Sequence, residues 1–270
     1  MKIYIPTFKR IDNQITFDNL PDEIKENVIL VVQEQERNEH KSDCEYLVID
    51  DDIGIAKTRE IIYYHAGKKR FAMLDDDLKI FRRNRKYYGE TSNMEKSKRQ
   101  ILYEDFTYML DEFNTIMDDD DVMHIGMRDT ALPPNGKRYY FNSLVLGAHF
   151  IDGSKLSRFI DDVDWNYVKT GEDTLINLEF LTRGYKSVIS DEFAINGKEN
   201  FGKKGGCSSF RDSNSDEAEH MKLVERYGEH IIRPTDEFYD LKHMGKHRKF
   251  KIDCKSAYKS SQVNTLEKFL

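Results

Sequence analysis

The chain has 270 residues, a formal net charge of −7 and 39% hydrophobic residues, which suits one large domain, or a domain with an appendage, and argues against global disorder. Its longest apolar runs fall well short of the roughly 20 residues that span a bilayer, and no apolar signal segment follows Met1. The three widely spaced cysteines, Cys44, Cys207 and Cys254, argue against a disulfide framework or a zinc cluster and suit a reducing cytoplasm.

The first half of the chain alternates predicted strands with predicted helices. Apolar, β-branched segments predict strands at 2–6, 27–33 and 45–50. Apolar residues at helical spacing predict a helix over 55–65 that ends at Gly67. Residues 70–74 (RFAML) predict a strand that is buried on both faces, because its apolar residues do not alternate with polar ones. This order indicates an α/β sheet.

The second half is expected to add one long helix and further strands. Residues 99–117 predict an amphipathic helix, and strand-like stretches follow at 122–127 and 139–151. The polar segment 79–98 predicts an irregular excursion over the surface. We predict a domain over 1–200 and an extension over 201–270 that holds a Gly-rich loop, a short helix around 214–227 and a basic tail.

Three carboxylates, Asp75, Asp76 and Asp77, directly follow the buried strand at 70–74. Ligands of open α/β sheets bind beyond the carboxyl ends of the strands. The spacing Asp-x-Asp offers the hard oxygen ligands that Mg²⁺ and Mn²⁺ prefer, and such a metal would relieve the mutual repulsion of the acids. The alternative is an ordinary acidic loop or helix cap, as we expect for the acids at 118–121.

A second acidic pair, Glu172 and Asp173, begins a predicted helix within 170–186 that Thr170 caps and Gly184 closes. The helix dipole favours carboxylates at this end and alone explains the pair. The same position also suits a general base that is held rigidly and partly buried.

Two local basic patches stand out on this acidic protein. Residues 79–103 contain eight Lys or Arg against two Glu, and residues 241–261 contain seven against one Asp. The first patch interleaves cations with Tyr87 and Tyr88, which could stack on a nucleic-acid base. The patches are either solvated surface or the contact face for a polyanion.

In this order, the segments IPTFKR (5–10), GIAKTR (54–59), FAMLDDD (71–77) and GEDTLINLEFLTRGYK (171–186) resemble a GT-A-fold glycosyltransferase over residues 1 to about 200. With the closing GKKGGCSS (202–209), the chain is most similar to the phage and TET-associated DNA glycosyltransferases. Those enzymes add sugars to hydroxylated pyrimidines in DNA.

The resemblance implies a single Rossmann-like mixed sheet flanked by helices, with a basic C-terminal extension that completes the active site. It implies that Asp77 and Asp75 bind Mn²⁺ or Mg²⁺, and that Asp173, with Glu172, supplies the base of an inverting reaction or orients the acceptor in a retaining one. A late histidine often completes such a metal site, and His220, His230, His243 and His247 compete for that role. The implied contacts to the donor nucleotide are Pro6, Thr7, Arg10, Lys57, Arg59, Asp75, Asp76, Lys203 and Lys204.

The expected reaction moves a sugar from a UDP-sugar to a hydroxymethylated or hydroxylated pyrimidine, cytosine or uracil, in double-stranded DNA, inside an infected bacterium if the chain is phage-encoded. The sugar and the oligomeric state are not readable. One alternative is a GT-A transferase acting on a glycan, a lipid carrier or a protein, and another is a non-catalytic nucleic-acid-binding protein. The expected DNA contacts are Arg82, Arg83, Arg85, Lys86, Lys246, Arg248 and Lys249.

Overall fold

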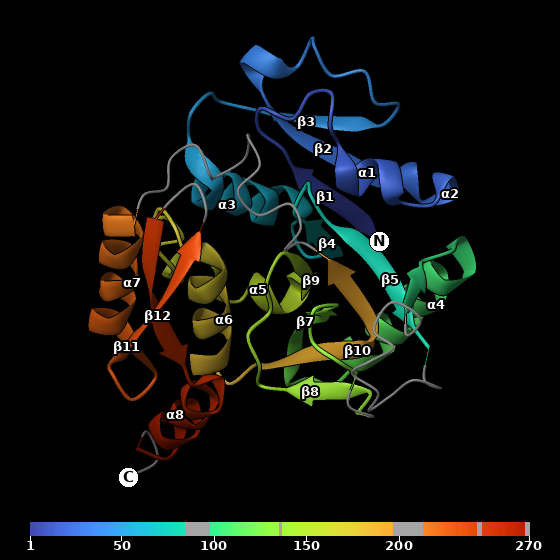
Figure 1. The fold of residues 1–270 in the computed structure, drawn as a ribbon. Helices are drawn as coiled ribbons and strands as arrows, with labels where there is room; N and C mark the ends of the chain where they lie inside the picture. The colour runs from blue at the N-terminus through green and yellow to red at the C-terminus, as the bar shows by residue number, and fades with distance from the viewer. Residues whose placement is uncertain (85–97, 135–136, 197–212, 242–244, 268–270) are drawn as a thin grey trace.

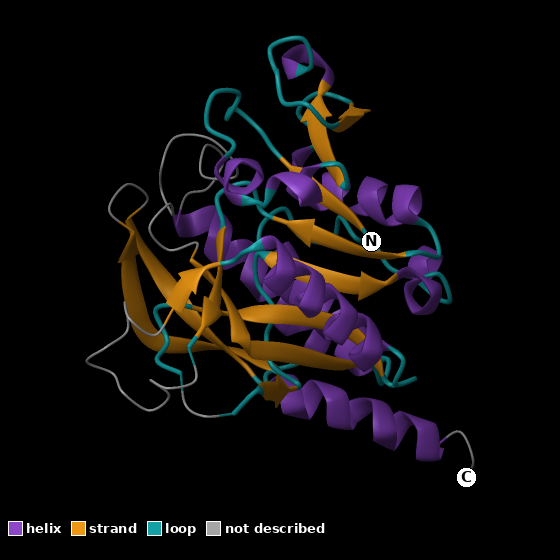
Figure 2. Ribbon diagram, turned by 90° about the vertical axis from the view of Figure 1, so that its right-hand side faces the viewer, coloured by secondary structure: helices purple, strands orange, loops and turns teal. Residues whose placement is uncertain are grey.

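A mixed β-sheet runs through the centre of the computed structural model, which describes residues 1–84, 98–134, 137–196, 213–241 and 245–267 (Figures 1 and 2). Its strands are β1 (Lys2–Pro6), β2 (Val28–Gln33), β3 (Glu45–Ile49), β4 (Arg70–Leu74), β5 (Lys79–Arg83), β6 (Lys98–Gln100), β7 (Val122–Asp129), β8 (Tyr139–Phe141), β9 (Ala148–Asp152) and β10 (Lys186–Asn196). They lie in the order β3-β2-β1-β4-β9-β7-β10-β5-β6, and β8 pairs with β10.

The sheet combines parallel and antiparallel pairs. Strands β1, β2, β3 and β4 run parallel, and so do β7 and β10. Strand β9 lies antiparallel between β4 and β7, and β5 lies antiparallel to β10. This arrangement confirms the predicted α/β class with a mixed sheet flanked by helices.

Helices cover both faces of the sheet because successive strand residues point to opposite faces. Ile3 and Ile5 pack with the helices of one face, and Tyr4 packs with those of the other. The first face carries α1 (Ile15–Asn19), α2 (Asp22–Lys25) and α4 (Tyr103–Met117). The second face carries α3 (Gly54–Ala66), α5 (Gly153–Leu156) and α6 (Glu172–Thr182).

The C-terminal part folds against α6, on the side away from the sheet. It consists of α7 (Ser213–Tyr227), the hairpin β11 (Ile232–Leu241) and β12 (Gly245–Ile252), and α8 (Cys254–Glu267), coloured orange to red in Figure 1. Leu175, Leu178 and Leu181 of α6 pack into this part, whereas Ile176 and Phe180 pack toward the sheet. The helix α7 matches the short helix predicted around 214–227, and the segment predicted as a basic tail forms strands of the hairpin and α8.

Several predicted boundaries also need correction. The helix expected from residue 99 begins at Tyr103, because residues 98–100 form β6 and pair with β5. The ends of the expected surface excursion 79–98 are therefore strands. The stretch 139–151 divides into β8 and β9. Gly171, with a φ of +81°, precedes α6 in place of the expected cap Thr170.

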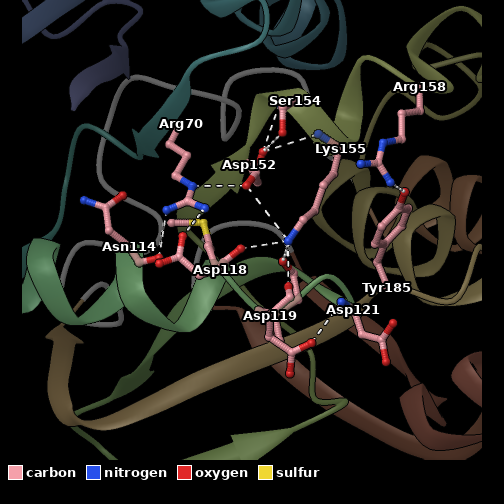
Figure 3. A network of polar contacts seen from close by, with 12 residues as sticks. Arg70, Asn114, Asp118, Asp119, Asp121, Asp152, Ser154, Lys155, Arg158 and Tyr185 are labelled. Atoms are coloured by element: carbon pink, nitrogen blue, oxygen red, sulfur yellow. Dashed lines mark hydrogen bonds and ion pairs between the residues drawn. The ribbon is translucent and has the colours of Figure 1, made fainter.

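A polar network closes the end of β4 opposite to the three acids (Figure 3). Lys155 is buried, and its Nζ donates to the carbonyl oxygens of Met117, Asp119 and Val122 at 2.8, 2.7 and 2.7 Å. Asp152 accepts from Nε of Arg70 at 3.1 Å. Lys155 thus satisfies the last carbonyl group of α4, at Met117, and two carbonyl groups of the turn and strand that follow. The acids at 118–121 form the expected exposed turn.

Candidate active site

The three acids that follow β4 lie at the centre of the sheet, where the loop between β4 and β5 begins. Thr16 of α1 fixes this loop, since its N–H donates to the carbonyl oxygen of Asp76 at 3.0 Å and its hydroxyl donates to that of Asp75. The N–H of Leu78 donates back to the Thr16 hydroxyl oxygen at 2.8 Å. The backbone of the acidic loop is therefore held in place before any ligand binds.

Arg59 of α3 brings the two predicted acidic motifs together. Its side chain is buried, and Nη2 lies 3.1 Å from Oδ1 of Asp75 and 3.3 Å from Oε1 of Glu172. Nη1 contacts Oδ1 of Asp173. The helix start at 172 and the strand end at 74 thus form one cluster around Arg59.

A second arginine serves the other two acids. Nη1 of Arg10 lies 3.3 Å from Oδ1 of Asp76, and Nη2 lies 3.2 Å from Oδ2 of Asp77. Arg10 is also buried, so both arginines neutralise the carboxylates from the interior of the protein. This pairing is part of the answer to how the chain tolerates three adjacent acids.

Burial and the two arginines shift the pKa values of the acids in opposite directions. Burial raises the pKa of Asp75, with further contributions from Asp173 and Asp77, while Arg59 offsets only part of the increase. Burial also raises the pKa of Asp76 to about 7 despite Arg10. Burial would also raise the pKa of Asp173. Arg59 and His149 outweigh burial and hold the pKa of this carboxyl well below its usual range.

The remaining residues expected at the donor side lie on β1, on the loop after it and on α3. Pro6 ends β1 in register with Val31 of β2. Thr7 is buried, and its hydroxyl accepts from Nε2 of Gln14 at 2.9 Å. Lys57 is half-exposed and pairs with Glu60 at 2.7 Å. Lys203 and Lys204 lie outside the described residues.

Three residues that the sequence did not single out support the acids. The carbonyl of Gly147 accepts from the N–H of Asp75 at 2.8 Å, and its own N–H donates to Oδ2 of Asp173 at 3.3 Å. Asn177, one turn after Asp173 on α6, holds both backbone groups of Val145 at 2.9 and 2.8 Å. His149 of β9 lies with Nε2 3.0 Å from Oδ1 of Asp173. No local pattern marks these residues, because their partners are distant in sequence.

The C-terminal part contributes one histidine to the edge of this cluster. The ring of His220 on α7 lies 3.3 Å from the position that a Cβ on Gly171 would take, directly before Glu172. Its Nδ1 is 2.8 Å from the carbonyl oxygen of Asp216, which leaves Nε2 as the bare nitrogen. His230 instead lies beside Gly228.

Of the two remaining candidate histidines, only His247 belongs to the residues that the structure describes. His247 is buried and pairs with Asp216 at 3.3 Å. His243 lies outside the described residues. Among the residues that are described, no three His, Cys, Asp or Glu side chains form a preassembled metal cage.

The cations expected to contact DNA divide into buried and exposed groups. The side chain of Arg83 is 1% exposed and donates to the carbonyls of Asp129 and Leu132 at 2.9 Å each, so Arg83 lies in the interior. Arg82 pairs with Asp105 and Glu192 at 2.6 and 2.7 Å. Both arginines thus have partners within the fold.

On the hairpin, Lys246 is exposed, Arg248 lies 3.2 Å from Glu217, and Lys249 pairs with Glu237 at 2.9 Å. Arg85 and Lys86 lie outside the described residues. A pocket of about 490 Å³ opens beside the first patch, lined by Arg82, Arg83, Asn84, Lys98, Arg99, Tyr108 and Glu192.

Comparison with known protein families identifies the family of this chain. Residues 1–206 match the family described as TET-Associated Glycosyltransferase. The chain belongs to this family. The match spans the acidic loop, Arg59 and the start of α6, and it confirms the resemblance carried by the four sequence motifs. No curated protein matches the chain in sequence.

Solved structures show distant similarity to this family member. Staphylococcus aureus TarS 1-349 aligns with a TM-score of 0.44 and 12% identity, over 83% of this chain and 66% of that chain, just under two thirds of its length. A provisionally assigned glucose-1-phosphate thymidylyltransferase from Bacillus anthracis, in complex with sucrose, aligns with a TM-score of 0.40 and 16% identity, over 71% and 86% of the two chains. Within the described residues, no helix of this chain is long and apolar enough to cross a membrane.

Proposed function

We propose that this protein is a metal-dependent GT-A-type glycosyltransferase that moves a sugar from a UDP-sugar to a hydroxylated pyrimidine in DNA. The observation that carries the proposal is the cluster of five acids around Arg59 and Arg10, at the carboxyl end of β4, in a chain of this family. Ligands of open α/β sheets bind at this edge.

The donor set of the cluster fits a divalent cation. Asp75 and Asp77 offer hard carboxylate oxygens. Burial raises the pKa of Asp75, the neighbouring carboxylates add to this increase, and Arg59 offsets only part of it. Oδ2 of Asp76 and Oε2 of Glu172 are buried without hydrogen-bond partners in the described structure. Mg²⁺ and Mn²⁺ are commonly held by one or two carboxylates together with substrate phosphates, so a complete protein cage is not required.

Asp75 and Asp77 would hold this metal, with His220 as the proposed additional ligand among the four histidines. The bound metal would take up the negative charge that develops on the diphosphate leaving group. Arg10 and Arg59 already have carboxylate partners, so their main role would be to set the charge and geometry of Asp75, Asp76 and Asp77.

Asp173 is the proposed base of an inverting reaction. Its side chain is 18% exposed, so an acceptor hydroxyl can reach it, while Arg59 and His149 fix its orientation. Its low pKa keeps it ionised near neutrality but makes it a weak base, which suits proton removal that accompanies attack on the sugar. In a retaining reaction the same carboxylate would orient the acceptor.

The exposed cations are the proposed contacts to DNA phosphates. Lys246 and Lys249 of the hairpin, and Arg99 beside the pocket, replace buried Arg83 in this role. Because the chain carries a net charge of −7, DNA binding would depend on such local patches and would weaken steeply with salt.

The deciding experiment screens nucleotide sugars, with and without Mn²⁺, against phage DNA that contains hydroxymethylcytosine or hydroxymethyluracil, with products read by nucleoside mass spectrometry. We expect metal-dependent transfer that Asp77→Ala abolishes and that Asp173→Asn lowers at least ~100-fold. Transfer by Asp77→Ala at the wild-type level in chelator would contradict the metal assignment. Transfer only to glycans, lipid carriers or proteins would favour the first alternative acceptor class, and DNA binding without any transfer would favour the non-catalytic one.

The DNA assignment has its own control. The double variant Lys246→Glu, Lys249→Glu should bind duplex DNA more weakly and with a lower salt slope than Lys68→Glu, Lys69→Glu, which makes the same charge change at the exposed turn after α3. Equal binding by the two variants would leave the hairpin cations as ordinary surface.

A further inference from the structure

Two histidines, His124 of β7 and His149 of β9, form a buried pair behind Asp173. Both side chains are fully buried, and their rings are nearly parallel, with centroids 5.1 Å apart and an interplanar angle of 8°. Nε2 of His124 lies 2.9 Å from Nδ1 of His149. Burial lowers the pKa of both imidazoles, and it outweighs the upward effect of Asp173. The pair is therefore neutral.

The contacts of the pair determine where its protons lie. A neutral imidazole has one N–H and one bare nitrogen, whereas an ionised carboxylate only accepts hydrogen bonds. Asp173 is ionised because its pKa is lowered, so Nε2 of His149 must carry the proton that bonds Oδ1 at 3.0 Å. Nη1 of Arg59 lies 3.1 Å from the same nitrogen, but it already has the Asp173 carboxylate as its acceptor.

The tautomer of His124 follows from that of His149. With its proton on Nε2, His149 has a bare Nδ1, which accepts from Nε2–H of His124. Nδ1 of His124 is then bare, and this atom is buried without a hydrogen-bond partner among the described residues. A bare buried nitrogen is tolerated better than an unpaired N–H. The surroundings of the pair thus agree with a single arrangement of protons.

We infer that His149 is a positioning residue for Asp173 and that His124 fixes the tautomer of His149. The inference rests on the proposed role of Asp173. Oδ1 of Asp173 is engaged by His149 and Arg59, whereas Oδ2 accepts only the longer bond from the N–H of Gly147, at 3.3 Å, among the contacts described. The pair therefore leaves Oδ2 for the hydroxyl of the acceptor.

The charged and titratable groups that face His149 are Asp173 and Glu172 from α6, Arg59 from α3 and His124 from β7. Removing the N–H that His149 donates to Asp173 disfavours the ionised carboxylate and raises its pKa. His149→Leu removes this donor and still fills the space, whereas His149→Gln keeps a donating amide nitrogen. If His149 had a purely structural role, the two variants would show the same pH dependence of kcat.

The first test needs no substrate. Long-range ¹H–¹⁵N spectra of histidine-labelled protein, assigned with His149→Gln and His124→Phe, should show both rings as neutral Nε2–H tautomers from pH 5.5 to 8. An imidazolium, or an Nδ1–H tautomer for His149, would overturn the inference whether or not the proposed reaction is correct.

The second test uses the nucleotide sugar and modified DNA on which the wild type is active. His149→Leu should lower kcat ~10–100-fold with little change in KM for the donor, and should move the acidic limb of the kcat profile to higher pH. His149→Gln should keep most of kcat. Equal losses in both variants, with an unmoved profile, would show a packing role only. Full activity of Asp173→Asn would refute the role of Asp173 as the base. If Asp173→Asn is impaired and His149→Leu is not, the role of Asp173 stands and only the positioning role of His149 is refuted.

Discussion

Nη2 of Arg59 lies 3.1 Å from Oδ1 of Asp75, and this ion pair joins the face of α3 to the end of the central strand β4. The same guanidinium also contacts Glu172 and Asp173. One buried cation thus holds together two acidic motifs that lie almost 100 residues apart, and the geometry of the site depends on it.

Arg59→Met should lower the free energy of unfolding at pH 7 by about 3–5 kcal/mol, because it leaves buried carboxylates without their cation. In the wild type the lowered pKa of Asp173 contributes stability above the unfolded pKa near 4, and this contribution is lost as the pH falls. In the variant the carboxyl pKa values rise, so the deficit should shrink between pH 7 and pH 5 in urea denaturation. Arg59→Lys keeps the charge and should show a smaller, less pH-dependent loss; a deficit in Arg59→Met that is equal at both pH values would contradict the assignment.

Gly147→Ala should disturb Asp75 as well as the backbone. Gly147 has a φ of +68°, and a Cβ there would lie 3.2 Å from Oδ2 of Asp75. The control Gly184→Ala meets a comparable backbone penalty at φ +89°, next to Ser261 and away from the acids. Each substitution should cost about 1–2 kcal/mol in stability. Only Gly147→Ala should weaken Mn²⁺ binding in titration calorimetry, and equal Mn²⁺ affinities would refute the proposed link to Asp75.

Asp105→Asn should make the free energy of unfolding less dependent on pH in the acidic range. Burial raises the pKa of Asp105, but hydrogen bonds from Arg99 and Arg82 outweigh it and lower this pKa to about 2. The stability that Asp105 contributes is present above pH 4 and is lost as the pH falls toward 2. The variant should be about 2 kcal/mol less stable at pH 7, with a gap that narrows on acidification. Asp111→Asn, an exposed position on the same helix, should match the wild type throughout; a constant gap for Asp105→Asn would be inconsistent with the ion pairs.

Lys155→Met should destabilise the network of Figure 3 by about 2–4 kcal/mol, since three backbone carbonyls lose their buried donor. Lys69→Met removes an exposed lysine and should change the free energy of unfolding by less than about 0.5 kcal/mol. Urea denaturation of the two variants measures the difference. Similar stabilities would mean that water replaces the Lys155 ammonium without cost.

The sequence by itself determined the elements that local patterns specify. The apolar strands at 2–6, 27–33, 45–50 and 70–74 and the helix that ends at Gly67 all form as predicted, because period and composition decide whether a segment can bury its side chains. The order of the motifs also indicated the family correctly. The acidic loop and the helix start at 172 were identified as site candidates for the same reason, since each acid follows or begins a regular element.

Only the tertiary structure decided which charges meet. Arg59 and Arg10 were expected to contact the nucleotide, and the structure shows that both are buried and paired with the acids. Arg83 was expected to contact DNA, but it lies in the interior. His149, His124 and Gly147 carried no signal in the sequence. Residues 98–100 became a strand because β5 lies beside them, and the basic tail became a hairpin. The physical reason is that a charged side chain takes the buried partner that the sheet order brings within about 4 Å, and sheet order is set by long-range packing that no local pattern encodes.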